Sequence, residues 1–159
     1  MIINAPAGAG KSTLLPLALM NEAWLAGKKI LMLEPRRLAV RSIATRMSYL
    51  LDEPIGRTIG DRIRFDTKIV QQTKIEVLTE GILTRMLHSD NELRDVGLIV
   101  FDEFHERSIH ADVALALCRE AQQVLRPDLR IMIMSATLDM PLLADLLKAA
   151  VVISKGRPF

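Results

Sequence analysis

Six short, mostly apolar runs recur along the chain, and helical patterns occupy most of the stretches between them. The runs are MIINA (1–5), KILMLE (29–34), KIEVLT (74–79), VGLIVFDE (96–103), LRIMIMSA (129–136) and AVVIS (150–154). Strands with continuous rather than alternating apolar residues are typical of parallel sheets that are buried on both faces. The alternation therefore predicts an α/β fold, in which helices cover both faces of a parallel sheet as a three-layer sandwich.

The helices are predicted at residues 11–26, 36–51, 80–89, 111–125 and 141–148. Thr79 and Asp139 each offer a side-chain oxygen to a free helix N–H, so both are predicted N-caps. Pro16 lacks the N–H that a helix interior needs, so we expect a kink or an irregular turn there. Residues 54–66 fit neither pattern, and IGDRIRF (59–65) is a candidate twisted strand.

The length of 159 residues suits one compact core, and no repeat, low-complexity segment or linker divides the chain, so a single domain is predicted for residues 1–159. The chain begins inside its first strand and stops at GRPF just after its last, so we expect one domain of a longer protein. No apolar run approaches the roughly 18 residues that span a bilayer, and no signal-peptide pattern is present. Cys118 is the single cysteine and lies in the apolar run ADVALALC, which favours a buried packing role. A cytoplasmic protein without a membrane partner is predicted.

The net charge of +2 is too small to indicate a partner by itself. Residues 36–68 nevertheless hold eight basic residues against four acidic ones. This segment is a candidate anion-facing surface, and an ordinary solvated face is the alternative interpretation.

The stretch APAGAGKS (5–12) matches the phosphate-binding loop G-x-x-x-x-G-K-[ST] at every defining position except the first, where Ala5 replaces glycine. Gly8 and Gly10 allow backbone N–H groups to point at phosphate oxygens, and a helix from Lys11 would direct its positive end at the same anion. Lys11 is predicted to reach the β- and γ-phosphates of ATP, and Ser12 to ligate Mg²⁺. The predicted ATP-binding residues of this loop are Ala7, Gly8, Ala9, Gly10, Lys11, Ser12 and Thr13.

The dinucleotide fingerprint G-x-G-x-x-G is the rival interpretation of the same loop. Gly8 and Gly10 follow a strand, and Glu34 ends the next strand near the place of a ribose-binding acid. The fingerprint fails at its third glycine, which is Thr13 here, and it gives no role to Lys11.

The apolar strand LIVFDE (98–103) ends in two carboxylates, as the second acidic motif of a phosphate-loop enzyme does. Asp102 is predicted to hold Mg²⁺ through its water shell, and Glu103 to orient or deprotonate the water that attacks the γ-phosphate. His105 and His110 stand five residues apart, whereas a zincin needs two histidines four apart on one helix face, so histidine-bound metal is not expected.

With DEFHERS (102–108) added, the chain resembles the DExH-box helicases of superfamily two, in particular the DEAH/RHA group and its HrpB-type bacterial members. APAGAGKST resembles motif I, EPRRLAVRS motif Ia, TEGILTR motif Ib, DEFHER motif II and SAT (135–137) motif III, in that order along the chain. RIRFD also resembles the arginine-bearing strand that this group has between motifs Ia and Ib. The resemblance implies a P-loop NTPase of RecA-like fold with ATP and Mg²⁺ as cofactors.

The resemblance also implies roles for single residues. His105 would link the ATP site to the rest of the protein, Ser135 and Thr137 would couple hydrolysis to strand separation, and Arg46 would stack on the adenine base. The phosphate backbone of single-stranded nucleic acid would be contacted by Arg36, Arg37, Thr79 and Arg85; the resemblance favours RNA, and DNA is the alternative. Backbone phosphates carry no sequence information, so no base specificity is expected. For Arg37 a place on the outer face of a helix is the alternative.

The stretch Q-x-x-G-R-x-G-R of the family is absent from these 159 residues, so the second RecA-like domain with its arginine finger is expected to be missing from this chain. Such a finger accelerates hydrolysis about a thousand-fold or more, so the fragment alone is predicted to bind ATP poorly and to be nearly inactive. A non-helicase P-loop enzyme and a nucleotide-binding module without catalysis are the alternative functions.

Overall fold

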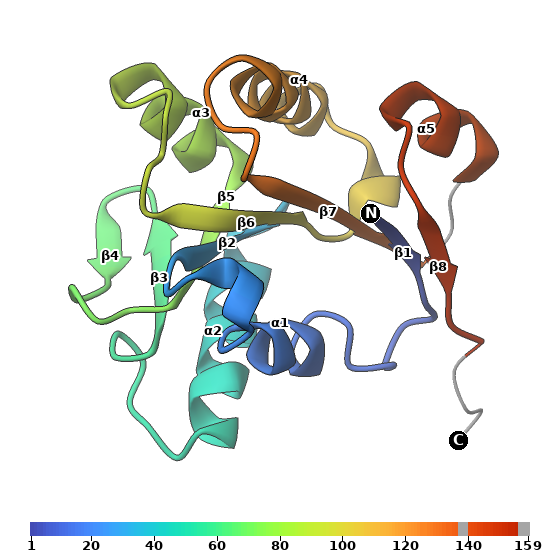
Figure 1. The fold of residues 1–159 in the computed structure, drawn as a ribbon. Helices are drawn as coiled ribbons and strands as arrows, with labels where there is room; N and C mark the ends of the chain where they lie inside the picture. The colour runs from blue at the N-terminus through green and yellow to red at the C-terminus, as the bar shows by residue number, and fades with distance from the viewer. Residues whose placement is uncertain (137–139, 156–159) are drawn as a thin grey trace.

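A computed structural model of the chain describes residues 1–136 and 140–155, with only the backbone of residue 140, and is built around an eight-stranded sheet (Figure 1). The strand order is β4-β3-β5-β2-β6-β7-β1-β8. Every neighbouring pair is parallel except β3 and β4, which form an antiparallel hairpin. The strands are β1 (Ile2–Asn4), β2 (Lys29–Glu34), β3 (Ile59–Ile63), β4 (Asp66–Lys68), β5 (Ile75–Thr79), β6 (Val96–Phe101), β7 (Arg130–Ser135) and β8 (Val151–Ile153).

Helices cover both faces of this sheet, as predicted. In Figure 1, α1 (Leu14–Leu19) and α2 (Arg37–Leu50) lie below the sheet, and α3 (Glu80–Ser89) and α4 (Ile109–Val124) lie above it. The fifth helix, α5 (Met140–Leu147), lies beside β8, and short 3₁₀ turns occupy Ala23–Leu25 and Phe104–Glu106. The α/β prediction is therefore confirmed.

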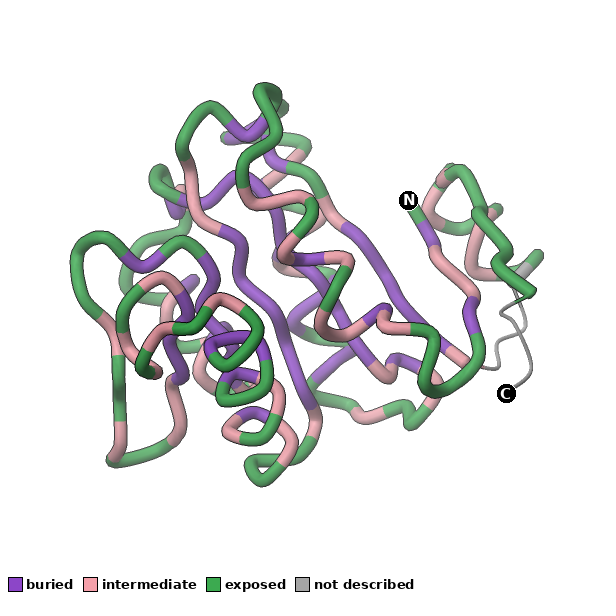
Figure 2. Tube along the Cα trace, turned by 90° about the horizontal axis from the view of Figure 1, so that it is seen from below, coloured by how far each residue is buried: buried purple, intermediate pink, exposed green. Residues whose placement is uncertain are grey.

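Two apolar clusters explain why the central strands are apolar at consecutive positions. Val77 packs in a cluster with Val40 of α2, whereas Leu78, the next residue of β5, packs in a cluster with Leu83 of α3. Because successive side chains of a strand point to opposite faces, an uninterrupted apolar run is buried on both sides. Figure 2 shows the central strands buried along most of their length. Cys118 is fully buried in α4, and burial raises the pKa of its thiol to about 12, as suits a packing residue.

The first helix is much shorter than predicted. Helix α1 spans Leu14–Leu19, so the expected helix over residues 11–26 is wrong at both ends. Pro16 explains the late start, because it has no N–H for the carbonyl of Ser12, four residues earlier, and its ring would clash with that carbonyl in a helix. The carbonyl of Gly10 accepts hydrogen bonds from the N–H groups of Thr13 (3.2 Å) and Leu14 (2.8 Å) instead. Lys11 and Ser12 therefore lie in a turn and not in a helix.

Helix capping also departs from prediction. Thr79 is the N-cap residue of α3, as predicted, but its side chain does not make the expected capping hydrogen bond. Asp139, the other predicted cap, lies outside the described residues. The hydroxyl of Ser108 caps α4 by accepting a hydrogen bond from the N–H of Ala111 at 2.9 Å, which moves the start of α4 to Ile109, two residues earlier than predicted.

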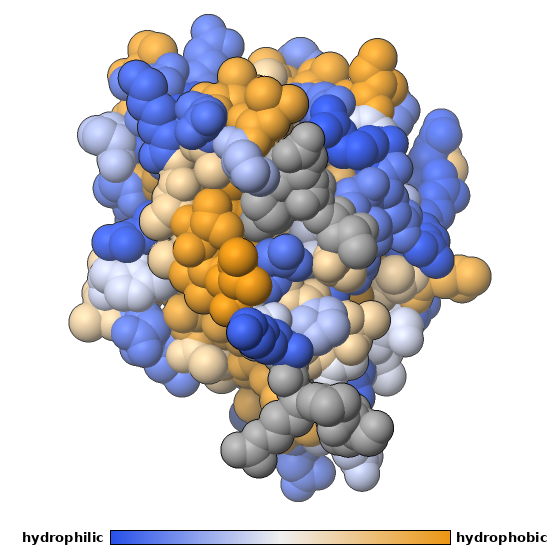
Figure 3. All heavy atoms as spheres, turned by 90° about the vertical axis from the view of Figure 1, so that its right-hand side faces the viewer, coloured by the Kyte–Doolittle hydropathy of each residue, from blue (hydrophilic) through white to orange (hydrophobic). Residues whose placement is uncertain are grey.

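The two ends of the sheet differ in character. Strand β3 confirms the candidate strand within residues 59–65, whereas β4 was not predicted because its three residues are polar or exposed. Strand β8 forms the opposite edge, and Figure 3 shows apolar surface on this side of the molecule. The exposed apolar residues of α5 and β8 are Leu142, Leu146, Val151, Val152 and Ile153. In the part of the chain that the structure describes, no helix is long and apolar enough to cross a membrane.

Candidate functional site

The predicted motifs meet at one edge of the sheet. Parallel strands place their carboxyl ends at the same edge, which is where ligands bind in open α/β sheets. The phosphate loop follows β1, motif Ia follows β2, motif Ib follows β5, motif II follows β6 and motif III follows β7. The topology therefore gathers segments that are far apart in the sequence.

The phosphate loop owes its shape to two glycines. Gly8 has a φ of +80° and Gly10 a φ of +79°, a region that other residues rarely adopt. A Cβ on Gly10 would also lie 2.8 Å from Cδ1 of Leu14, so the leucine side chain would have to move to make room for it. Ala5 is not among the described residues with positive φ, and it is buried with its N–H bonded to the carbonyl of Ser135 at 3.1 Å. The backbone at Ala5 therefore does not need the glycine of the general template.

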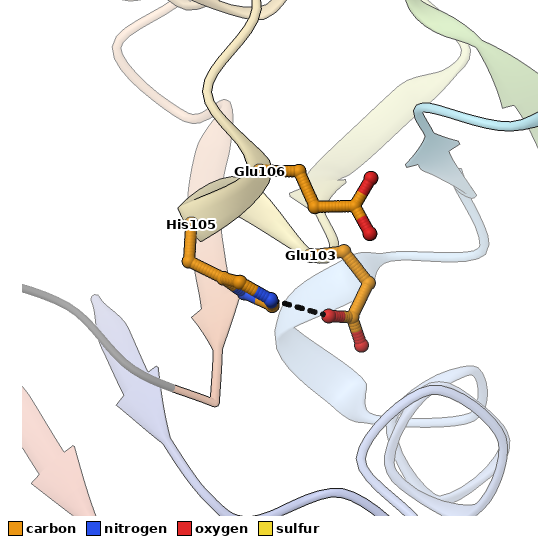
Figure 4. Close-up of side chains that lie close together, drawn as sticks. All are labelled: Glu103, His105 and Glu106. Carbon is orange, nitrogen blue, oxygen red and sulfur yellow. Dashed lines mark ion pairs between the residues drawn. The ribbon is translucent and has the colours of Figure 1, made fainter.

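Two side chains that are predicted to act on the same phosphate lie against each other. Nζ of Lys11 is 3.4 Å from Oε1 of Glu103, and the lysine is only 6% exposed. The other carboxylate oxygen of Glu103 lies 3.2 Å from Nε2 of His105 (Figure 4). Glu103 itself has a φ of +48°, an uncommon value for a non-glycine residue that often marks functional sites. Lysine, glutamate and histidine thus form one contiguous polar group.

Asp102 has the surroundings of a cation ligand. It is 4% exposed, and its Oδ1 accepts a hydrogen bond from the N–H of Glu103 at 2.8 Å. Its other oxygen, Oδ2, is buried and has no hydrogen-bond partner within the described residues. Buried polar atoms almost always have a partner, and Mg²⁺ prefers carboxylate and hydroxyl oxygens. The unpaired Oδ2 of Asp102 fits such an ion, for which the phosphate-loop motif offers the hydroxyl of Ser12 as a second ligand.

Glu34, the first residue of EPRRLAVRS, is a member of this group to which the sequence gave a role only in the rival dinucleotide fingerprint. It ends β2, the strand that pairs with β6, so it stands beside Asp102 at the sheet edge. Burial first, and then the negative charge of the neighbouring Asp102, raise the pKa of Glu34 from 4.5 to about 10. Glu34 is therefore uncharged at neutral pH. The sequence shows that Glu34 ends a strand, but its place beside Asp102 becomes visible only once the strand order is known.

The polar group of Lys11, Glu103 and His105 extends to Glu106. The ligand atoms of Glu103, His105 and Glu106 are all within 4.8 Å of one another (Figure 4). Glu106 forms an ion pair with Arg36, the residue immediately before α2. His110, the other histidine considered in the sequence, is exposed in the first turn of α4 and does not belong to this cluster.

The predicted nucleic-acid residues differ in how close they lie to this edge. Arg36, Arg37 and Thr79 stand where β2 and β5 end and their helices begin, and both arginines are exposed. Arg85 is exposed in the second turn of α3.

Arg46 is exposed on α2 with its guanidinium carbon 5.6 Å from the centre of the Tyr49 ring. A helix rises about 1.5 Å per residue, so Arg46 lies about 14 Å further along α2 than Arg37. Ser135 is the last residue of β7 and is fully buried. Thr137 lies outside the described residues.

Comparisons with known proteins identify relatives of the whole chain. The family model described as DEAD/DEAH box helicase matches residues 1–146. The chain is 53% identical over 160 residues to the ATP-dependent RNA helicase HrpB of Escherichia coli (strain K12), with all of this chain and 20% of that protein covered. It is 40% identical over 146 residues to a probable ATP-dependent RNA helicase DHX35 homolog of Caenorhabditis elegans, with 91% of this chain and 20% of that protein covered.

Solved structures agree with the sequence comparison. The crystal structure of the Escherichia coli DEAH/RHA helicase HrpB matches with a TM-score of 0.93 and 52% identity, and covers 100% of this chain and 20% of that one. The chain thus spans about a fifth of the length of the relatives it matches.

Proposed function

The chain belongs to the DEAD/DEAH box helicase family, and on that premise we propose that it is the first RecA-like, ATP-binding domain of an ATP-dependent RNA helicase. The observation that carries the proposal is the 3.4 Å contact between Lys11 of the phosphate loop and Glu103 of the acidic motif. This contact brings together, at the carboxyl ends of the strands, the lysine and the glutamate that hydrolysis of a phosphoanhydride would use. In the complete protein, hydrolysis of ATP would drive translocation on, or unwinding of, RNA.

Each residue of the ATP site has a defined task in this proposal. The backbone of residues 7–13 holds the phosphates, and Lys11 contributes a positive charge next to them. Glu103 orients the attacking water and accepts its proton. Asp102 and Ser12 would hold Mg²⁺, whose charge neutralises the phosphate oxygens during the displacement. His105, whose ring nitrogen contacts Glu103, would pass the state of the site to the rest of the protein.

The nucleic-acid side of the proposal rests on exposed cations at the same edge. Arg36, Arg37, Thr79 and Arg85 would contact the phosphate backbone of a single RNA strand, which fixes its position without reading its sequence. Ser135 and Thr137 would couple hydrolysis to strand separation. Arg46 on the flank of α2 would stack on the adenine base. A second RecA-like domain would close over the ATP site and supply an arginine finger. The cytoplasmic location expected from the sequence stays a prediction.

Two variants of the complete protein test the ATP site. Glu103→Gln keeps the shape of the side chain but cannot accept the proton, so we expect unchanged or tighter ATP binding and at least a hundred-fold slower phosphate release in the presence of single-stranded RNA. Lys11→Ala removes the charge beside the phosphates and is expected to weaken ATP binding measured by calorimetry. Glu120→Gln, on the exposed side of α4, is the matched control and should match the wild type in both assays. Normal turnover in Glu103→Gln would show that another group is the base.

A further inference from the structure

The turn that follows Glu103 is tied to a strand-binding motif by an ion pair. Glu106 receives two hydrogen bonds from the guanidinium of Arg36, one from Nη2 to Oε1 and one from Nε to Oε2, the latter at 3.3 Å. The two residues are 70 positions apart in the sequence. Arg36 also keeps the pKa of Glu106 below its usual range, first through the hydrogen bond, so the carboxylate is charged at neutral pH. Motif Ia and motif II are therefore in direct contact.

A second, separate bond ties the same segment to motif Ib. The hydroxyl of Ser108 donates a hydrogen bond to Oε2 of Glu80 at 2.7 Å. Glu80 directly follows Thr79, one of the predicted strand-binding residues, and Ser108 caps α4. Both motifs that are proposed to hold the nucleic acid are thus bonded to the five residues after the proposed base.

The ion pair leaves Arg36 able to bind a phosphate. Its Nε and Nη2 atoms face Glu106, and the N–H groups of Nη1 remain on the other edge of the planar guanidinium. The arginine side chain is 70% exposed, whereas that of Glu106 is 28% exposed. Because exposed ion pairs contribute little to stability, stability alone does not account for this arrangement. A fixed guanidinium with one open edge is suited to a backbone phosphate.

The connection from Glu106 back to Glu103 is short and rigid. The N–H of Glu106 donates to the carbonyl of Glu103 at 2.9 Å, which closes the 3₁₀ turn Phe104–Glu106. Phe104 is buried at this turn, and its ring meets that of Phe101 edge-on with centroids 6.1 Å apart. Glu106 and Glu103 are therefore joined by one hydrogen-bonded turn whose central side chain is anchored in the core.

We propose that Glu106 is a positioning residue that couples strand binding to the ATP site, an inference that rests on the function proposed above. Glu106 holds Arg36 in the orientation that presents its open edge to a phosphate of the strand. When the strand engages Arg36, the ion pair transmits the engagement through the turn 103–106 to Glu103, which contacts Lys11 of the phosphate loop. Glu106 touches neither ATP nor the strand in this arrangement and acts through Arg36 and Glu103.

The test is a binding cycle in the complete protein. The dissociation constant of a non-hydrolysable ATP analogue is measured with and without a saturating single-stranded oligouridylate, and the ratio of the two constants is the coupling factor. Such factors are reciprocal and typically about 5- to 150-fold. Glu106→Gln keeps the size of the side chain and removes its charge, so we expect the coupling factor to fall by about five-fold or to unity. Thermal unfolding of the same variant should stay within about 2 °C of the wild type.

Three further variants sharpen the assignment. Asp112→Asn breaks the neighbouring exposed pair of Arg107 with Asp112, 3.2 Å in length, and should keep the wild-type coupling factor. In an Arg36→Gln background, Glu106→Gln should cause no additional loss, because both residues belong to one connection. Glu106→Asp keeps the charge on a shorter side chain and should recover part of the coupling factor.

The outcomes separate the inference from the function on which it rests. A wild type that binds neither the analogue nor the oligonucleotide would refute the proposed function and this inference with it. A coupled wild type whose factor survives Glu106→Gln, or falls equally in Asp112→Asn, would overturn the inference alone.

Discussion

Glu34→Gln is expected to stabilise the domain at neutral pH, although it replaces a buried residue beside the proposed ATP site. Glu34 is 1% exposed, and its pKa in the folded chain is raised from 4.5 to about 10, first by burial and then by Asp102. The folded state therefore keeps the proton up to about pH 10, whereas the unfolded chain releases it near pH 4.5. Between these two values the unfolded state binds fewer protons, so the free energy of unfolding falls as the pH rises.

The magnitude follows from that interval. Each pH unit between the two pKa values costs the wild type about 1.4 kcal/mol of stability, so at pH 7.5 the accumulated cost reaches about 4 kcal/mol. Glutamine does not titrate and has nearly the same shape as the protonated carboxylic acid. Glu34→Gln should therefore gain up to about 4 kcal/mol over the wild type at pH 7.5 and almost nothing at pH 4.5.

The assay is urea unfolding of residues 1–159, followed by circular dichroism at pH 4.5, 6, 7.5 and 9 with EDTA to exclude divalent ions. The free energy of unfolding is compared between the wild type and Glu34→Gln at each pH. Glu120→Gln, exposed on α4, controls for the loss of a carboxylate and should stay within about 0.5 kcal/mol of the wild type. A gain that does not grow with pH, or a loss of stability at pH 7.5, would refute the reasoning that Glu34 is buried in its neutral form.

Three other changes test the fold around the site. Glu76 is as buried as Glu34, but it forms ion pairs with Lys29 at 3.0 Å and with Arg62 at 2.7 Å. Glu76→Gln should therefore lower the free energy of unfolding by about 2–3 kcal/mol, and an unchanged value would show that these pairs do not stabilise the fold. The guanidinium of Arg126 donates hydrogen bonds to the backbone carbonyls of residues 92, 93 and 96. Arg126→Ala should therefore lower the free energy of unfolding by about 3 kcal/mol and Arg126→Lys by less, and equal losses would contradict the role of the planar guanidinium. Ile153 is 67% exposed on β8, and an exposed apolar edge strand can pair with a second copy of the chain. Ile153→Lys should therefore reduce light scattering of residues 1–159 at high concentration without lowering the midpoint of thermal unfolding. Unchanged scattering would exclude this edge as the site of self-association.

The sequence predicted the sheet well because six of its strands are apolar on both faces. Strand β2 agrees with the predicted run KILMLE at both ends, and α3 agrees with the predicted helix 80–89. The strand β4 was missed because DTK carries no apolar residue to bury, and it exists only because β3 is there to pair with it. The first helix is shorter than the predicted one because Pro16 cannot donate a hydrogen bond to the carbonyl of Ser12 and its ring crowds that carbonyl.

The site was predictable as far as its residues belong to a motif. Lys11, Asp102 and Glu103 stand in short patterns whose chemistry can be deduced from the residue types and spacing. Glu34 and Glu106 stand in the quoted motifs EPRRLAVRS and DEFHER, but their contacts required the strand order, because β2 pairs with both β5 and β6 although these strands lie far from it in the sequence. Side chains at the ends of neighbouring strands meet only through that order, which no local pattern records.

The carboxylates at this edge divide their tasks through their surroundings. Glu34 is neutral because it is buried beside Asp102, so it does not add a second negative charge next to the proposed Mg²⁺ ligand. Glu103 is 29% exposed and contacts Lys11, which is itself almost fully buried and needs a counter-charge when no phosphate is present. In the proposed function, ATP would replace this contact with one between Lys11 and a phosphate. The exchange would free Glu103 to orient the attacking water, so the ion pair with Lys11 would hold the proposed base until the nucleotide binds.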